Sequence, residues 1–248
     1  MKGFIILGLS VSSVLSAQTD STQIKEIQEV SFTRRLPVSK EIINVQKDLG
    51  SKNLGQDLPI LLKNQMSVVA TSDAGNGVGY TGFRIRGSAG TSINVMLNGV
   101  PYNDSESQGT FFVNIPDMAS SASQIVIQRG VGTSSNGTAS FGASVNILTK
   151  NPDEKPYVLG QFSAGSFNTM KTSFEAGSGK FLNNLLSVSA RYSTINSDGY
   201  IDRAFSKLNS YSINALFEKG NTKIRFLAFG GKEKTYQAWN GIDAATYE

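Results

Sequence analysis

The clearest pattern in this sequence is an alternation of apolar and polar residues in five consecutive segments between residues 158 and 228. A period of two residues predicts β-strands with two unlike faces. Five charged residues all fall on the polar phase: Lys171, Glu175, Arg191, Lys223 and Arg225. The other phase holds apolar and small residues: Val158, Gly160, Phe162, Ala164; Met170, Thr172, Phe174, Ala176; Leu186, Val188, Ala190, Tyr192; Tyr211, Ile213, Ala215, Phe217; and Ile224, Phe226, Ala228.

Two structures produce this alternation. In a membrane β-barrel the apolar phase faces lipid and the polar phase faces the lumen. In a soluble β-sandwich the apolar phase is buried between two sheets. The absence of charges from one phase of all five segments favours the membrane barrel.

Residues 49–150 have a different, α+β pattern. Asp57 before Leu58-Pro59 predicts a short helix with Asp57 as its N-cap, and a second short helix is expected at 116–122. Asn98-Gly99 is a strong signal for a two-residue β-hairpin turn. We expect strands at 67–70, 81–87, 92–101, 124–130 and 144–150.

The N-terminus has the pattern of a secretory signal. Lys2 precedes the apolar stretch from Phe4 to Leu15, and Ser16-Ala17 supplies small residues for cleavage. Residues 18–48 are polar and read as an arm that follows the signal. Within the arm, residues 26–33 alternate polar and apolar side chains and could add as a strand to the edge of a partner's sheet, or simply remain solvated.

Composition removes several classes of function. The chain contains no Cys and no His, which excludes disulfides, thiol chemistry, His-based metal sites and Ser-His nucleophiles within it. The net charge is +4, but the basic residues are spread along the chain, which argues against nucleic-acid binding. Residues 77–82 match the G-x-G-x-x-G spacing of dinucleotide-binding turns, yet they precede a predicted strand where that motif requires a helix. We therefore expect no cofactor, no metal site and no catalytic residues.

Several motifs between residues 83 and 150 resemble, in order and spacing, the plug motifs of TonB-dependent outer-membrane receptors. They are Phe83-Arg84-Ile85-Arg86-Gly87, Asn94-Val95-Met96-Leu97-Asn98-Gly99-Val100-Pro101, Ile127-Gln128-Arg129-Gly130, Phe141-Gly142 and Val145-Asn146-Ile147-Leu148-Thr149-Lys150. The resemblance implies a signal peptide at 1–17, a periplasmic arm at 18–48, an α+β plug domain at 49–150 and the first antiparallel transmembrane β-barrel strands at 151–248. Five strands cannot close a barrel, and plugged transporters use about 22, so we expect this chain to be a fragment.

The resemblance also implies a function and its residues. The family takes up scarce ligands across the outer membrane of Gram-negative bacteria, driven by TonB of the TonB-ExbB-ExbD complex. An iron-siderophore is the expected ligand, with cobalamin, a sugar or a peptide, or a passive porin or adhesin, as alternatives. By position, the TonB-interacting box would be Glu29, Val30, Ser31, Phe32 and Thr33. The loop after the Asn98-Gly99 turn is the expected ligand contact, through Tyr102, Asn103, Asp104, Glu106 and Gln108, and Arg84, Arg86 and Arg129 are expected to form plug-to-barrel ion pairs.

Overall fold

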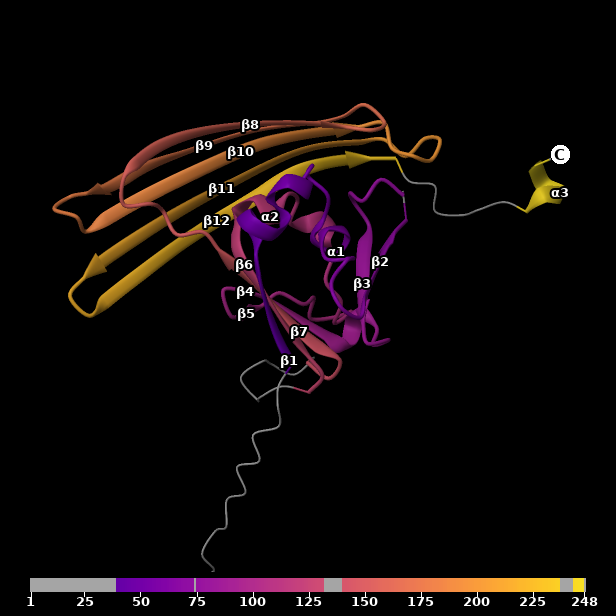
Figure 1. The fold of residues 1–248 in the computed structure, drawn as a ribbon, viewed down its shortest axis with the longest axis horizontal. Helices are drawn as coiled ribbons and strands as arrows, with labels where there is room; N and C mark the ends of the chain where they lie inside the picture. Colours follow the sequence, from indigo (N-terminus) through magenta and orange to yellow (C-terminus); the bar gives the residue numbers. More distant parts are fainter. Residues whose placement is uncertain (1–38, 74, 132–139, 237–242, 248) are drawn as a thin grey trace, which may run out of the picture. The chain divides into compact units, whose positions relative to one another are not determined.

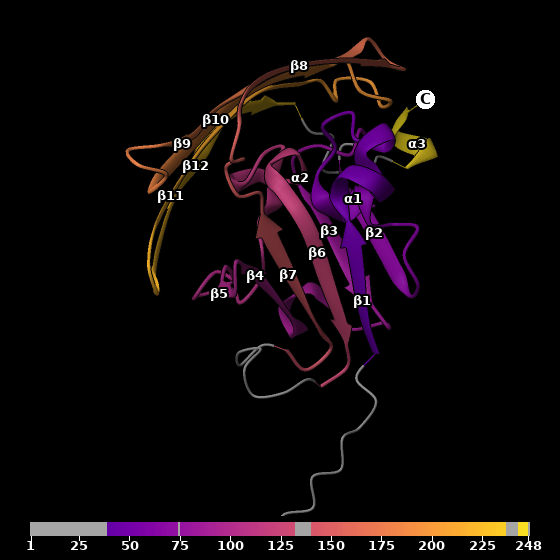
Figure 2. The same cartoon turned by 60° about the vertical axis from the view of Figure 1, so that its left-hand side comes forward.

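The computed structural model describes residues 39–73, 75–131, 140–236 and 243–247. The described elements lie within one compact unit, Pro37–Glu248. They form an α+β region, here called the plug region (residues 39–149), and a curved five-stranded sheet, here called the wall (β8–β12), which arches over one side of the plug region (Figures 1 and 2).

The plug region is built on a mixed sheet with the strand order β1-β6-β7-β4-β5. β4 and β7 run parallel, and the other neighbours in this sheet are antiparallel. A separate hairpin, β2-β3, completes its strands. The bounds are β1 Ser39–Asn44, β2 Val68–Ser72, β3 Thr81–Ile85, β4 Ile93–Leu97, β5 Val100–Pro101, β6 Ala122–Arg129 and β7 Ala143–Thr149. The strands expected from the sequence in this region are confirmed, with small shifts at their ends; β1, which lies in the segment assigned to the arm, was not predicted and pairs with β6.

The helices of the plug region are single turns. The two α-helices are α1 (Leu58–Leu61) and α2 (Met118–Ser121), which confirms both expected helices although α2 is shorter than the predicted 116–122. The remaining turns are a π-helix, η1 (Val45–Leu49), and three 3-10 helices, η2 (Gly50–Lys52), η3 (Gly90–Ser92) and η4 (Phe112–Asn114). A last helical turn, α3 (Ala244–Tyr247), follows the wall.

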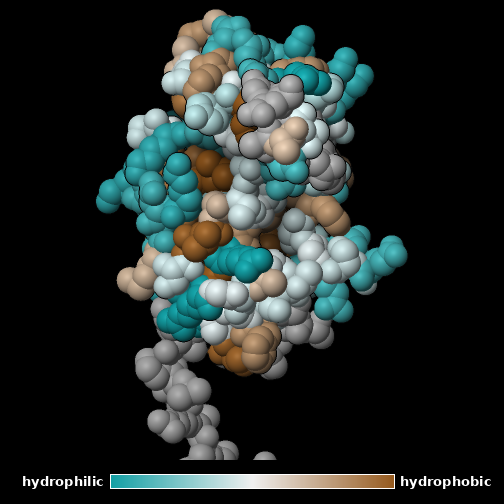
Figure 3. Space-filling view, turned by 90° about the vertical axis from the view of Figure 1, so that its right-hand side faces the viewer, coloured by the Kyte–Doolittle hydropathy of each residue, from teal (hydrophilic) through white to brown (hydrophobic). Residues whose placement is uncertain are grey.

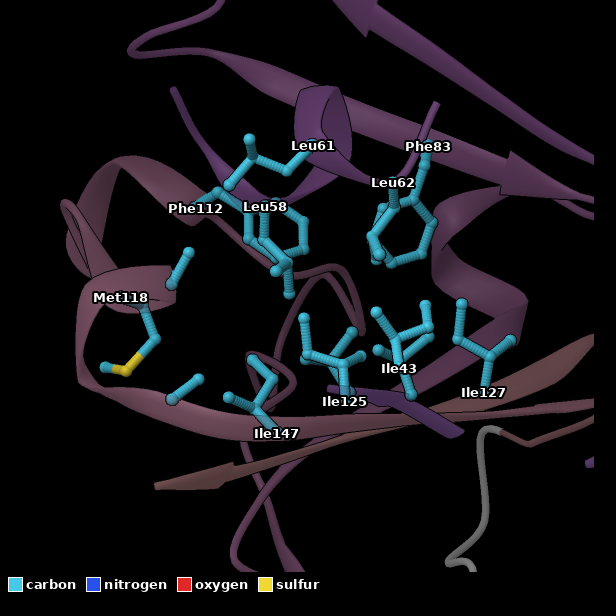
Figure 4. Close-up of a cluster of buried hydrophobic side chains, with 14 of the residues drawn as sticks. Ile43, Leu58, Leu61, Leu62, Phe83, Phe112, Met118, Ile125, Ile127 and Ile147 are labelled. Carbon is cyan, nitrogen blue, oxygen red and sulfur yellow. The ribbon is translucent and has the colours of Figure 1, made fainter. Parts of the chain in front are cut away.

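One hydrophobic core stabilises the plug region. Ile43, Ile125, Ile127 and Ile147 of the sheet face the side chains of α1 and of the β3 and η4 segments, as Figure 4 shows. The rings of Phe83 and Phe112 pack against each other in this core, with their centroids 5.4 Å apart. Each fully buried aliphatic side chain contributes about 1.5–3 kcal/mol, so the single-turn helices are held by packing rather than by helix propensity.

The Asn98-Gly99 hairpin turn is confirmed. Both residues have positive φ, 52° and 84°, as a type I′ turn requires. The Asn98 side chain bonds to β7: its Nδ2 donates to Thr149 Oγ1 (3.0 Å) and its Oδ1 accepts from the Thr149 backbone N–H (2.9 Å). The turn thus joins the β4-β5 end of the sheet to the end of β7.

The wall is an antiparallel meander in which each strand pairs with the next in sequence. The strand register places the polar residues of one strand opposite the polar residues of the next. For example, Arg191 lies opposite Ser212, and Ser193 lies opposite Ser210. The bounds are β8 Pro156–Gly165, β9 Thr169–Phe181, β10 Leu186–Ser197, β11 Ser206–Lys219 and β12 Thr222–Thr235. These strands confirm the five segments expected from the alternation.

The two faces of the wall are opposite in character to those of a soluble sandwich. Its apolar phase is exposed, with Val158 83% and Phe162 69% accessible. Its polar phase is buried against the plug region; this phase includes Lys171, Arg191 and Ser193. A sandwich would bury the apolar phase, so that alternative is contradicted, and the α+β plug with an unclosed sheet of antiparallel barrel strands is confirmed.

Among the described residues, no helix is both long and apolar enough to cross a membrane.

Candidate functional site

A buried polar network joins the plug region to the wall, and its centre is the carboxylate of Asp117. Asp117 immediately precedes α2 and is 1% exposed. Ile115 and Met118 on either side of it are buried in the plug core, so packing fixes the backbone that carries the carboxylate. Asp117 has φ 50° and ψ 31°, a left-handed conformation that costs a residue with a Cβ some energy.

Each oxygen of the Asp117 carboxylate accepts two side-chain hydrogen bonds. Oδ1 accepts from Lys171 Nζ at 2.8 Å and from Ser120 Oγ at 2.6 Å. Oδ2 accepts from Arg191 Nη1 at 2.7 Å and from Ser193 Oγ at 2.6 Å. Lys171 lies on β9 and Arg191 and Ser193 on β10, so three of the four donors belong to the wall.

The charge state of Asp117 follows from these partners. Burial by itself would raise the pKa of Asp117, but the charges of Lys171 and Arg191 and the hydrogen bonds to the carboxylate outweigh it and lower the pKa below the usual value. Asp117 is therefore ionised at neutral pH. Its interaction with two buried cations links the plug region to the wall by charge-assisted hydrogen bonds.

Serine hydroxyls extend the network around Arg191. Arg191 Nε donates to Ser121 Oγ of α2 (3.0 Å), and Nη2 donates to Ser210 Oγ of β11 (3.0 Å). Ser121 Oγ in turn donates to Ser212 Oγ across the interface at 2.9 Å. We refer to the following residues as the Asp117 network: Asp117, Ser120, Ser121, Lys171, Arg191, Ser193, Ser210 and Ser212.

A second set of contacts joins the end of the plug region to the wall. Arg225 Nη2 of β12 donates to the backbone oxygens of Thr149 (2.9 Å) and Lys150 (2.7 Å). Lys150 Nζ pairs with Glu175 Oε2 of β9 at 3.1 Å, and Glu175 Oε1 accepts from Tyr157 O–H at 2.7 Å. Of the five charged residues that the alternation placed on the inner phase, Lys171, Arg191 and Arg225 thus contact the plug region and Glu175 contacts Lys150 directly after it, whereas Lys223 pairs with Glu218 of β11.

Among the described residues, none of the three arginines expected to form plug-to-barrel ion pairs forms one with the wall. Arg129 pairs with Glu41 of β1 and donates from Nε to the Met66 backbone oxygen at 3.0 Å, so its ion pair is within the plug region. Arg84 and Arg86 are exposed, and neither forms a salt bridge with another described residue. The polarity is reversed in the Asp117 network, where the plug supplies the carboxylate and the wall supplies the cations.

The loop expected to contact the ligand is largely occupied by its own hydrogen bonds. Asn103 Nδ2 donates to the backbone oxygens of Ile93 and Gln108, and Oδ1 accepts from the Val95 N–H. Asp104 Oδ1 accepts from the N–H groups of residues 106 and 107 and from the Ser107 hydroxyl, and these bonds lower the pKa of Asp104.

The other residues of that loop differ in their surroundings. The Tyr102 ring packs against Phe229 of β12, with centroids 6.3 Å apart. Partial burial raises the pKa of its hydroxyl. Glu106 and Gln108 are exposed and remain available to a ligand.

Another part of the plug region meets the wall where β10 ends and β11 begins. Asn76 Nδ2 donates to the Ala204 backbone oxygen (2.8 Å) and to Ser206 Oγ (2.7 Å). A cavity of about 180 Å³ lies close by; its polar lining consists of Gln56, Asn76, Ser166, Thr169 and Ser197. On the side of the molecule that carries β2 and β3, hydrophilic and hydrophobic residues are intermingled (Figure 3).

Asp57 does not act as the expected helix cap. It precedes α1, but its side chain makes no capping bond; instead Oδ2 accepts from Thr81 Oγ1 at 2.8 Å. Burial raises the pKa of Asp57 to about 7. The N-cap preference of Asp is a local rule, and here a tertiary partner on β3 replaces it.

The expected TonB-interacting residues 29–33 and the signal at 1–17 lie outside the described residues. Within the described ranges, no group of three or more Asp or Glu side chains is arranged to hold a metal ion.

Comparison with known proteins gives one family match and a set of shared folds. Residues 33–144 match the TonB-dependent receptor plug domain. No curated protein matches the sequence of the chain. Among solved structures, the unliganded ferric citrate transporter FecA has a TM-score of 0.65 at 16% identity, over 84% of this chain and 33% of that one.

Two further structures are similar to the same extent. The copper transporter OprC has a TM-score of 0.65 at 14% identity, over 80% of this chain and 32% of its own. The pyoverdine receptor FpvA of Pseudomonas aeruginosa has a TM-score of 0.62 at 14% identity, over 80% of this chain and 28% of its own. The chain thus spans about a third or less of the length of these structures. The chain therefore contains a TonB-dependent receptor plug domain at residues 33–144, and this domain is docked on antiparallel strands in the fold that these structures share.

Proposed function

We propose that this chain forms the plug and the first wall strands of an outer-membrane transporter that takes up a scarce chelated nutrient with energy supplied through TonB. The observation that carries the proposal is the docking of the plug region on the buried polar face of a sheet whose apolar face is exposed. An apolar outer face suits lipid, and a plug that fills the lumen must be displaced or rearranged before a solute can pass.

The connections of the wall suggest how it lies in the membrane. The β9-β10 and β11-β12 connections, 182–185 and 220–221, lie at one end of the wall, and the opposite end carries the three-residue β8-β9 connection, 166–168, and the longest connection, 198–205. In outer-membrane barrels the short turns are periplasmic and the longer loops extracellular. This orientation makes the Asn76 contact and the neighbouring cavity the external end, and it favours residues 53–57 and 75–80 over the 102–108 loop as the first ligand contact.

An iron chelate is the ligand class we propose. The similar structures include receptors described as binding pyoverdine, ferric yersiniabactin and ferric citrate. The copper transporter among them makes another metal the second candidate. Since the chain has no Cys and no His, it offers a metal cargo no thiolate or imidazole ligand.

TonB coupling is assigned to the arm. Residues 26–33 alternate polar and apolar side chains and precede the plug domain, which suits addition as a strand to the sheet of TonB. We place Glu29, Val30, Ser31, Phe32 and Thr33 in that contact. ExbB, ExbD and outer-membrane lipid are the remaining partners, and export through a cleaved signal at 1–17 is part of the same proposal.

A binding measurement tests the coupling. A peptide spanning residues 26–35 should retain the C-terminal domain of TonB in a pull-down. The matched control is the same peptide with Val30→Pro, because proline removes a backbone donor and cannot continue a strand ladder. Equal retention by the two peptides, or no retention by the native one, would contradict TonB coupling through this segment.

Ligand uptake is tested with the entire receptor in cells. Expression should rise when iron is withheld, and uptake of labelled ferric chelates should depend on TonB. Uptake that persists in cells without TonB would favour a passive porin.

A further inference from the structure

Three of the four donors to the Asp117 carboxylate belong to the wall. Lys171 Nζ, Arg191 Nη1 and Ser193 Oγ converge on the two carboxylate oxygens at 2.6–2.8 Å. These side chains lie on neighbouring strands, and the β9-β10 register places Lys171 opposite Ile195 and Ser193 opposite Ser173. Sheet pairing therefore fixes the backbone positions from which these side chains extend, and the hydroxyls of Ser120 and Ser121 on α2 also contact Lys171 Nζ and Arg191 Nε.

The charge balance of this region favours an anion. Two buried cations, Lys171 and Arg191, face a single carboxylate, Asp117. The nearest wall carboxylate in register with Arg191 is Glu175, but Glu175 is already paired with Lys150 and Tyr157. If the Asp117 carboxylate is removed while the plug stays docked, two buried cations lose their counter-charge, which is costly in a low-dielectric interior.

A small molecule can approach one of these donors, Lys171, through a cavity at the interface. A cavity of about 510 Å³ lies between plug residues 45–53 and strands β8 and β9, and Lys171 forms part of its lining. The rest of the lining is largely polar and includes Asn53, Ser120, Gln161 and Ser163. The cavity is far larger than a small carboxylate, and its polar lining suits a hydrated solute.

We propose that Lys171, Arg191 and Ser193 form a carboxylate-binding site on the wall, which Asp117 fills while the plug is in place. When Asp117 leaves, a carboxylate of another molecule takes its position between the same three donors. The role of this site in transport rests on the proposed function. In that role, the site would bind a cargo that is a carboxylate-bearing chelate, at a position beside the plug.

Chemical rescue tests the site. The Asp117→Gly variant of the entire receptor vacates the carboxylate position, and glycine tolerates the φ of 50° at this residue. The apparent Tm of the purified variant in detergent should fall by several degrees. Sodium formate should restore at least half of that loss in a saturable manner, whereas formamide and sodium chloride at the same concentration should not.

Two controls make the rescue specific. The wild-type receptor should show no such formate effect because Asp117 occupies the site. The double variant Asp117→Gly with Arg191→Gln should lose the rescue because one of the three donors is replaced. If formate raises the Tm of all three proteins equally, or if it does no better than chloride with Asp117→Gly, the proposal is wrong.

The test remains decisive if Asp117→Gly does not fold in ordinary buffer. In that case the refolding yield in formate is compared with the yield in formamide, and equal yields would overturn the proposal. Neither measurement involves TonB or uptake. A receptor that transports normally but shows no rescue contradicts only the carboxylate site, while a rescued receptor that does not transport contradicts only the proposed function.

Discussion

A disulfide between Ser121 and Ser212 should tether the plug to the wall. Their hydroxyl oxygens are 2.9 Å apart across the interface, and both residues are buried. The chain has no native cysteine, so the double variant Ser121→Cys with Ser212→Cys can form only this intramolecular bridge within it. We expect the bridge to form under mild oxidation because the two side chains point at each other.

The size of the effect follows from the length of the closed loop. The two positions are 91 residues apart in sequence, and for such a loop the chain-entropy estimate of disulfide stabilisation is about 4.6 kcal/mol. The substitutions also remove the Ser121–Ser212 hydrogen bond and the bond from Arg191 Nε to Ser121, at about 1 kcal/mol each. The oxidised variant should therefore exceed the wild type by about 2–3 kcal/mol and its own reduced form by about 4–5 kcal/mol.

The assay is denaturant unfolding of the purified receptor with and without reductant, after non-reducing electrophoresis has confirmed the bridge. The matched control is Ser121→Cys with Ile213→Cys. Ile213 is the neighbour of Ser212 on β11, but it belongs to the exposed phase of the wall, so this pair should not cross-link. Equal cross-linking of both pairs, or none in the Ser212 pair, would refute the docking of α2 on β11.

The same variant tests whether the plug leaves the wall during uptake. If Asp117 must leave Lys171 and Arg191 for cargo to pass, the oxidised variant should be inactive and reductant should restore uptake. Uptake that continues with the bridge intact would mean that the passage opens elsewhere around the plug.

Three further predictions concern the plug region. Burial raises the pKa of Asp57 from 3.8 to about 7, so between these pH values the folded state keeps a proton that the unfolded state has lost. The free energy of unfolding should therefore fall as the pH rises from about 4 to 7, by up to about 4 kcal/mol. Unfolding curves measured across this pH range should show a weaker pH dependence for Asp57→Asn. Glu41→Gln should weaken the pairing of Arg129 with β1 by about 1–3 kcal/mol, seen as faster hydrogen exchange of the β1 amides, and unchanged exchange would contradict a structural role for the pair. Asn103→Ala should cost about 1–3 kcal/mol and expose the Val95 amide to exchange; a loss of ligand binding without that exchange would instead favour the ligand role first expected of Asn103.

Local and periodic signals account for the parts of the fold that the sequence predicted. The period-two alternation located all five wall strands and their buried phase, since one face of a strand has a single environment along its length. Asn98-Gly99 located its hairpin because the turn itself demands positive φ. The cap expected at Asp57 failed because Thr81, which competes for its carboxylate, is 24 residues away in sequence and becomes a neighbour only in the folded molecule.

The Asp117 network could not be predicted in the same way, because its partners come from four separate segments. A signal for half of it was present: Lys171 and Arg191 lie on the inner phase of adjacent strands and so required a counter-charge from whatever fills the lumen. Nothing in the sequence identified Asp117 as that charge among the acidic residues of the plug region. The direction of its side chain depends on a left-handed backbone conformation that is held between the buried residues Ile115 and Met118. The arginines of the plug motifs were expected to supply the ionic contacts, yet the wall strands described here carry the cations themselves. The contacts between a plug and a barrel wall are therefore better predicted from the wall strands. Their periodicity defines which side chains face inward, and an unbalanced charge on that face indicates that the plug supplies the opposite charge.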